Sequence, residues 1–268
     1  MLLISKKILV FIIFFSIPTL IFPQNGIVLD KIIKSGELRV GTSGSQPPFT
    51  MKAKDGQLMG YEIELAKLLT TAMKLRLKFI EKPFSELLPA LEEGEIDVIM
   101  SGMTITPERN LKCSFVGPYI VSGKSILAKS KRIIDLDEMG EINRPTIKAA
   151  ALKGSTSQHF MENFTPEINL ILTEDYETAV RMILEDKVDI MIADYPICQL
   201  SILRHPDAGL ATLEEPLTIE PIGIALPPNA FQVHNLIANY MNALQIGGVL
   251  RDLEAKWFQD GSWLIRLP

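Results

Sequence analysis

The polar groups best suited to binding chemistry lie in the segment SGMTITPERN, residues 101–110. Within it, residues 106–108 (Thr-Pro-Glu) are typical of a helix start, with a hydroxyl N-cap, a proline at the first helical position and an acid in the first turn. Arg109 is unexpected there, because a cation in the first turn opposes the helix dipole. It is either a solvated surface arginine or a cleft arginine that holds a ligand carboxylate bidentately. In the second case the Thr104 hydroxyl and the N–H after Gly102 complete the anion site.

Further polar residues follow the ends of predicted strands. Asp194 closes an apolar strand and precedes Tyr195, so its carboxylate either caps the next helix or pairs with a ligand ammonium. The turn KGSTS, residues 153–157, contains Ser155 and Thr156. It either presents backbone N–H groups to an anion or serves as an ordinary helix N-cap.

The loop GTSGSQPPF, residues 41–49, follows the first predicted strand and therefore opens toward the same cleft. It brings Ser43 and Gln46 to the candidate site. Phe49 either walls the pocket or packs in the core, and the periodicity favours the core. A carboxylate site, an ammonium site and an apolar wall together suit a free α-amino acid.

Several other kinds of site are disfavoured. The chain lacks the glycine-rich patterns of nucleotide-binding loops. Its three histidines, His159, His205 and His234, show no metal-ligand spacing, and no C-x-x-C occurs, so we expect neither a metal nor another cofactor. We interpret Cys113 and Cys198 as buried small residues, with a disulfide between them as the alternative.

The amino end predicts an export signal over residues 1–24. Lys6 and Lys7 precede an apolar run from residue 8 to 22, which is short for a membrane span and contains Pro18. We place the mature start near residues 23–26 and expect a soluble periplasmic product. The remainder carries 25 basic and 32 acidic residues, a formal charge of -7, which argues against nucleic acid as a partner.

Strand-like apolar runs alternate with helix-like segments and the pattern then restarts, which predicts an α/β fold of two similar lobes, each with a mixed, mostly parallel sheet flanked by helices. Strands are predicted over residues 38–41, 75–79, 96–100, 146–152, 168–172, 188–193 and 222–226. Helices are predicted over residues 61–73, 84–93, 157–163, 176–186, 231–244 and 249–258.

The restart is visible as an internal repeat. A shift of 92 residues lays residues 84–102 on residues 176–194 without a gap and matches Glu93 with Glu185 and Asp97 with Asp189. A chance match of two helix-strand units is the alternative. Because open α/β sheets bind ligands at the carboxyl ends of their strands, a true repeat directs residues 102 and 194 toward a shared cleft.

The predicted division places residues 25–122 and 222–268 in lobe 1 and residues 123–221 in lobe 2. The chain then crosses between the lobes twice, within residues 122–129 and 218–223. Two crossings form a hinge rather than a flexible tether.

The motifs VGTSGSQPPF, DGQLMGYEIELAKLL, IDVIMSGMTITPER, FVGPY, LKGSTSQ and VDIMIAD resemble, in order, those of the extracellular solute-binding proteins of family 3. These are the polar-amino-acid-binding components of ABC importers. The resemblance implies the type II periplasmic-binding-protein fold, a free amino acid as ligand, an inner-membrane ABC permease as partner, and a monomer.

The resemblance also implies individual roles. The ligand α-carboxylate is bound by Arg109 and Thr104 and the α-amino group by Asp194, with further contacts from the Gly102 main chain and from the turn at Ser155 and Thr156. Some members carry an acidic residue near position 43 and an aromatic one near position 46, whereas this chain has Ser43 and Gln46. The preferred amino acid therefore stays open.

The main alternative is an enzyme, because the family is similar to the periplasmic cyclohexadienyl dehydratases, which act on prephenate or arogenate. Their catalytic glutamate falls three residues after Asp194, where this chain has Ile197, which cannot donate a proton. Glu62, Glu64 and Glu108 are other acids, but exposure on helices explains them more simply. We therefore expect a binding protein with no catalytic residue.

Overall fold

The computed structural model describes residues 26–129 and 142–268. The signal peptide predicted over residues 1–24 lies outside the described residues. No helix in the described part is long and apolar enough to span a bilayer.

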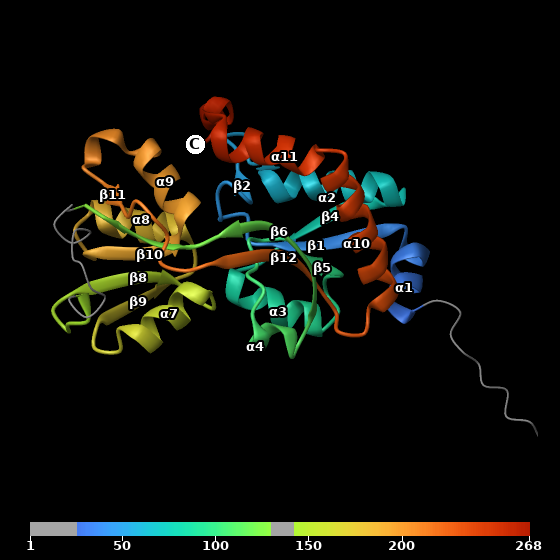
Figure 1. Cartoon of the computed structure of the whole chain (residues 1–268), viewed down its shortest axis with the longest axis horizontal. Coiled ribbons are helices and arrows are strands. Elements are labelled where there is room, and N and C mark those ends of the chain that lie inside the picture. The colour runs from blue at the N-terminus through green and yellow to red at the C-terminus, as the bar shows by residue number, and fades with distance from the viewer. Residues whose placement is uncertain (1–25, 130–141) are drawn as a thin grey trace, which may run out of the picture.

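The described residues form two lobes, each built on a five-stranded sheet, which lie side by side in Figure 1. In lobe 1, β1 pairs in parallel with β4 and β5, and β12 pairs antiparallel with β5 and β6. The strand order is β4 (Arg76–Glu81), β1 (Glu37–Thr42), β5 (Val98–Ile99), β12 (Glu220–Leu226) and β6 (Ser114–Ser122).

The sheet of lobe 2 repeats this plan. Here β8 pairs in parallel with β9 and β10, and β7 pairs antiparallel with β10 and β11. The strand order is β9 (Asn169–Thr173), β8 (Lys148–Leu152), β10 (Ile190–Asp194), β7 (Lys124–Ala128) and β11 (Ala211–Thr212). The predicted mixed sheets flanked by helices are confirmed, but the sheets are not mostly parallel, since each has two parallel and two antiparallel pairings.

Helices cover both faces of each sheet (Figure 1). The helices of lobe 1 are α1 (Ile27–Ser35), α2 (Tyr61–Met73), α3 (Phe84–Glu92), α4 (Pro107–Asn110), α10 (Phe231–Ile246) and α11 (Val249–Glu254). A short π-helix (Ala255–Gln259) and a 3-10 helix (Gly261–Arg266) follow α11. Lobe 1 also contains a small hairpin of β2 (Met51–Lys52) and β3 (Leu58–Met59). Lobe 2 carries α7 (Thr156–Phe164), α8 (Tyr176–Leu184), α9 (Tyr195–Arg204) and a 3-10 turn (Pro206–Ala208).

Helix α2 shows why the element limits follow from the residues. Its apolar residues Leu65, Ala66 and Leu69 are fully buried in the core that includes the lobe 1 sheet, and the helix ends where Lys74 adopts a left-handed conformation. The observed limits coincide with the predicted residues 61–73. The periodicity of the stripe was therefore sufficient to define this helix.

The 92-residue repeat is confirmed by the backbone. Helices α3 and α8 begin and end 92 residues apart, and each is followed by a left-handed residue, Gly94 (φ 72°) or Asp186 (φ 54°). The carboxylate of Asp97 accepts a hydrogen bond from the Arg39 N–H (2.9 Å), and that of Asp189 accepts one from the Lys148 N–H (2.8 Å). Both aspartates thus tie the residue before the central strand of their sheet, β5 or β10, to the neighbouring parallel strand, β1 or β8.

The two crossings between the lobes lie against each other. Only Gly123 separates β6 from β7, and the return passes from β11 to β12. The Leu217 N–H donates to the Lys124 carbonyl (2.7 Å), and the Lys124 N–H donates to the Thr218 hydroxyl (3.0 Å).

Strand β12 begins earlier than predicted. Glu220 pairs with Ser122 of β6, so residues 220 and 221 belong to the first sheet and not to lobe 2. An acid and a proline stood outside the apolar run, which is why the sequence pattern started the strand at residue 222.

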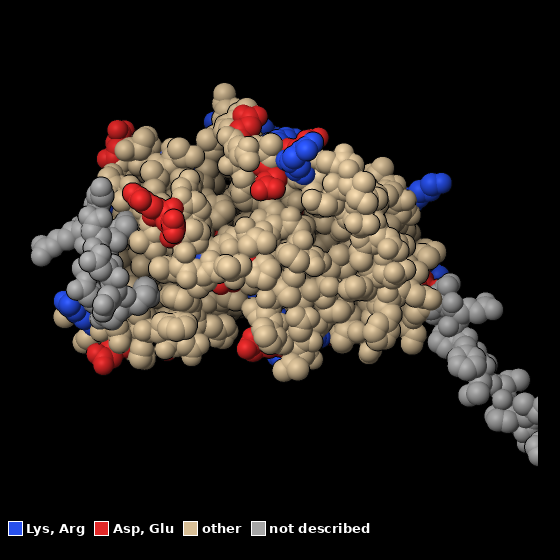
Figure 2. Space-filling view, viewed as in Figure 1, with Lys and Arg blue, Asp and Glu red and all other residues tan. Residues whose placement is uncertain are grey.

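Few charged side chains appear over the hinge strands β6 and β12 in the space-filling view, whereas several stand out near the edges of this face (Figure 2). The charged residues at the hinge are buried beneath this surface: Lys124, Asp194 and Glu220 are each less than a tenth exposed.

Candidate functional site

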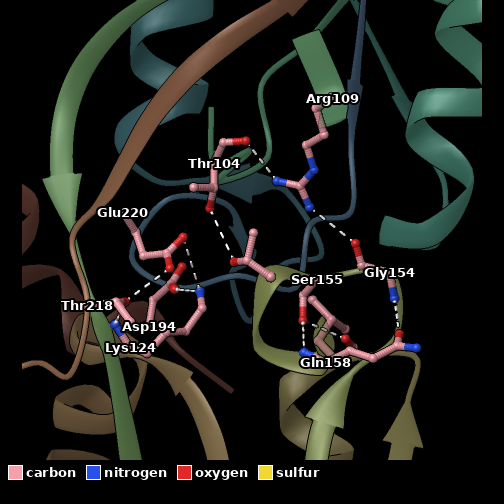
Figure 3. A network of polar contacts seen from close by, with 11 residues as sticks. Thr104, Arg109, Lys124, Gly154, Ser155, Gln158, Asp194, Thr218 and Glu220 are labelled. Carbon is pink, nitrogen blue, oxygen red and sulfur yellow. Dashed lines mark hydrogen bonds and ion pairs between the residues drawn. The ribbon is translucent and has the colours of Figure 1, made fainter. Parts of the chain in front are cut away.

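Arg109 lies in the short helix α4, between the lobes. The Thr106 hydroxyl caps this helix by accepting the Arg109 N–H (3.2 Å), as the sequence predicts. The arginine is only 8% exposed, which overturns its interpretation as a solvated surface residue. Its Nη1 donates to the Thr104 carbonyl of lobe 1 (2.8 Å) and its Nη2 to the Gly154 carbonyl of lobe 2 (3.2 Å), as Figure 3 shows.

The guanidinium of Arg109 bonds to carbonyl oxygens but, within the described residues, to no carboxylate. Burial lowers its pKa, and the fields of Glu220 and Asp194 act in the opposite direction. A buried cation that lacks an anionic partner is costly. This environment is therefore complementary to an added carboxylate.

Thr104 and Thr156 meet across the two lobes. Their hydroxyl oxygens are 3.5 Å apart, and Thr104 is held in place by a β-bridge to Ile222. The neighbouring Ser155 hydroxyl accepts the Gln158 N–H (3.2 Å) and donates to the Leu152 carbonyl (2.6 Å), which makes it the N-cap of α7. Of the Ser155 and Thr156 hydroxyls, that of Thr156 is the one directed at lobe 1.

The lobes touch at Gly154. Its φ of 74° is left-handed, and a methyl group added there would lie 3.0 Å from the Ser85 Cα and Cβ atoms of α3. The absence of a side chain thus permits the close approach that brings the Gly154 carbonyl to Arg109.

Asp194 occupies the N-cap position of α9, but its side chain makes no capping hydrogen bond. Its Oδ1 instead pairs with Lys124 Nζ at 2.6 Å (Figure 3). The capping interpretation is therefore wrong. In the structure the ammonium group that pairs with Asp194 is that of Lys124, whereas we expected the ammonium of a ligand.

Lys124 and Glu220 were not predicted as site residues. Lys124 Nζ lies 3.6 Å from Glu220 Oε2, and the Thr218 hydroxyl donates to Glu220 Oε1 (3.0 Å). One signal was available in the sequence: a lysine opens the run KSILA, which ends in three apolar residues, directly after the hinge glycine. Its buried partners come from elements far along the chain, and no local pattern points to them.

The Gly102 N–H donates to Glu62 Oε2 (2.8 Å), so this amide is held by the protein itself. Glu62 is fully buried and also accepts a hydrogen bond from the Tyr119 hydroxyl. Burial raises the pKa of Glu62 to about 7, against the lowering effect of those two hydrogen bonds. Its interpretation as a solvated helix acid is therefore wrong. Helical spacing gave a signal, since position 62 lies four residues before the buried Ala66.

The first loop packs around Ser101. The Ser43 N–H donates to the Ser101 hydroxyl (3.0 Å), which in turn donates to the Gln46 side-chain oxygen (2.8 Å). Gln46 also lies against Gly102. Phe49 is fully buried and packs edge-on against Phe258 in the core of lobe 1, which the periodicity favoured, and it does not wall the cleft.

A cavity of about 280 Å³ opens between the loop of lobe 1 and helices α8 and α9 of lobe 2; Pro47, Tyr176 and Ile197 are among its lining residues. Ile197, at the position where a dehydratase is expected to carry its acid, is 1% exposed. The residues described contain no cluster of three His, Cys, Asp or Glu side chains that could hold a metal. Cys113 and Cys198 are both buried and free, so the disulfide alternative is wrong.

Comparison with known proteins connects this geometry to a family. Residues 38–260 match the model of the bacterial extracellular solute-binding proteins, family 3. The chain is 24% identical to a cyclohexadienyl dehydratase of Pseudomonas aeruginosa (86% of each chain) and 25% identical to the ABC transporter arginine-binding protein 1 of Escherichia coli (83% of this chain, 90% of that one).

The fold is shared with a solved ancestral amino acid-binding protein, described as a precursor of cyclohexadienyl dehydratase, at a TM-score of 0.79 and 32% identity over 86% of this chain and 99% of that one. This similarity confirms the expected type II fold. The match to the family model spans nearly all of the described residues, and the chain belongs to the bacterial extracellular solute-binding proteins of family 3.

Proposed function

We propose that this protein captures a free amino acid between its lobes and delivers it to an ABC importer. The observation that carries the proposal is Arg109, a buried cation that reaches from lobe 1 to lobe 2 without a carboxylate partner among the described residues. A ligand α-carboxylate supplies that partner, with Thr104 and Thr156 offering hydroxyls from opposite sides. Asp194 is the group of opposite sign for the α-ammonium.

Ligand capture proceeds by closure about the two crossings at Gly123 and residues 213–219. The amino acid docks on Arg109 and Thr104 of lobe 1, and Thr156 and Asp194 of lobe 2 then close over it. Export through the signal peptide of residues 1–24 places the monomer in the periplasm. Closure there presents both lobe surfaces to the permease.

Removal of the Arg109 guanidinium tests the assignment. We expect Arg109→Ala to weaken binding by about 2 to 5 kcal/mol, which is roughly 30-fold to several thousand-fold in Kd, because the ligand carboxylate is left unpaired in a desolvated cleft. Isothermal calorimetry is run with the L-amino acid that most raises the melting temperature of the wild-type protein in a screen of the twenty common ones. Arg251→Ala, which removes a largely exposed arginine of α11, is the matched control.

Unchanged affinity in Arg109→Ala contradicts the assignment of the carboxylate site. The same screen includes prephenate, which is the substrate class of the enzyme alternative. Turnover of prephenate by the wild-type protein overturns the binding-protein proposal.

A further inference from the structure

Lys124 lies between two carboxylates, one from each lobe. Its side chain is 2% exposed, and its Nζ is 2.6 Å from Asp194 Oδ1 and 3.6 Å from Glu220 Oε2. Asp194 ends β10 of lobe 2, whereas Glu220 begins β12 of lobe 1. The three side chains are gathered at one place in Figure 3.

The charges of this cluster create a competition. Asp194 is the candidate partner of a ligand ammonium, but Lys124 already neutralises it at the shorter of the two distances. A ligand ammonium on the same carboxylate competes with Lys124 for it. If Lys124 gives way, its buried ammonium needs another anion, since an unpaired buried charge is strongly destabilising. Glu220 is that anion. The Thr218 hydroxyl holds its Oε1 (3.0 Å), while its Oε2 is the oxygen nearer to Lys124.

We propose that Lys124 is a specificity-determining residue that changes partners: it neutralises Asp194 before binding and moves onto Glu220 when the α-ammonium of the ligand docks on Asp194. The inference rests on the proposed function and deepens it, because it assigns the ammonium subsite a protein cation that the ligand must replace.

The exchange also connects recognition to the hinge. The Lys124 backbone is bonded on both sides to the second crossing, through the Leu217 N–H and the Thr218 hydroxyl. Lys124 and Asp194 both belong to lobe 2, so their ion pair lies within one lobe. When Lys124 pairs with Glu220 of lobe 1 instead, the ion pair links the two lobes. Arrival of the ammonium group thereby strengthens the connection at the hinge.

The exchange predicts how strongly the protein distinguishes an amino acid from the same molecule without its amino group. In the wild-type protein a 2-hydroxy acid leaves the Lys124–Asp194 pair intact, and it therefore binds only slightly more weakly than the amino acid. Without Lys124, Asp194 is an unpaired buried carboxylate and an ammonium-bearing ligand gains most. Without Glu220, the displaced lysine has no acceptor and the ammonium-bearing ligand is penalised.

The test measures the ratio of Kd for a 2-hydroxy acid to Kd for the L-amino acid with the same side chain, for example L-phenyllactate and L-phenylalanine. The amino acid is the one of the twenty that stabilises the wild-type protein most. We expect Lys124→Met to raise this ratio about tenfold or more, and Glu220→Gln to lower it about tenfold. Lys129→Met is the matched control. It removes the lysine directly after β7, whose side chain is 38% exposed and pairs with Asp186, and it leaves the ratio unchanged.

An unchanged ratio in Lys124→Met, with a native melting transition, overturns the exchange and leaves the amino-acid proposal standing. If Lys124→Met does not fold, Glu220→Gln decides, since an unchanged or raised ratio there overturns the exchange equally. If none of the twenty amino acids binds the wild-type protein, both the exchange and the proposed function are wrong.

Discussion

The two copies of the repeat, Phe84 to Gly102 and Tyr176 to Asp194, share a scaffold and differ at their ends. Their helices have matching limits, and each copy contains an aspartate that binds the backbone of the neighbouring parallel strand, β1 or β8. The first copy ends in a glycine whose N–H is held by the buried carboxylate of Glu62. The second ends in a carboxylate that is held by the buried ammonium of Lys124. The repeated unit thus provides a common framework. The end of each copy contacts a residue from outside the repeat, which is an acid in the first copy and a base in the second.

The shared aspartates give the first way to break the comparison. Asp97 is buried and binds both the N–H and the guanidinium of Arg39, whereas the exposed carboxylate of Asp189 binds, among the described residues, only the Lys148 N–H. We expect Asp97→Ala to lower the free energy of unfolding by about 3 to 4 kcal/mol and Asp189→Ala by about 1 kcal/mol. Urea denaturation of both variants checks this. Equal losses would mean that the Arg39 side chain adds nothing to the first copy.

Glu62, which binds the end of the first copy, makes the stability of the protein depend on pH. Burial raises the pKa of Glu62 from 4.5 to about 7, so the folded state binds the proton more tightly than the unfolded chain does. The associated stability is complete below pH 4.5 and is lost as the pH rises through about 7, a change of about 2 to 3 kcal/mol.

Glu62→Gln therefore removes this fall in the free energy of unfolding, as measured by urea denaturation at several pH values between 4.5 and 8. Glu64→Gln on the same helix, whose carboxylate pairs with Lys256 at the surface, is the matched control and keeps the fall. A pH dependence that persists in Glu62→Gln contradicts the prediction.

The smallest expected effect concerns the left-handed residue after each helix. Gly94→Ala places a side chain at a φ of 72° and lowers the free energy of unfolding by about 1 to 2 kcal/mol. Asp186→Gly changes it by less than about 0.5 kcal/mol. Relief of strain at a φ of 54° is offset there by the greater freedom of glycine in the unfolded chain and by loss of the exposed pair with Lys129. Thermal unfolding of both variants measures the asymmetry, and effects of equal size would remove it.

Much of the framework was predictable because its signals are local. The apolar stripe of α2 defines the helix from residue 61 to 73, and the 92-residue spacing finds two equivalent helix-strand units. The capped turn before Arg109 was also visible, since the Thr106 N-cap and the following proline and acid lie within one helical turn.

The buried ion pairs were not predictable in the same way. Lys124 and Asp194 are separated by 70 residues, and each stands at an end of its own apolar strand, so only their antiparallel pairing in the sheet brings them together. Glu62 was missed for a different reason. An acid in the first turn of a helix is usually exposed, and only the spacing to Ala66 shows that this one lies on the buried face.

The contact between Gly154 and Ser85 sets a mechanical limit on the molecule. A methyl group at position 154 would lie 3.0 Å from the Cα and Cβ atoms of Ser85, so glycine is the residue that lets lobe 2 come this close to α3. Any larger side chain there acts as a wedge. We expect such a wedge to hold the Gly154 carbonyl away from Arg109, without any change in the chemical groups of Arg109 and Asp194.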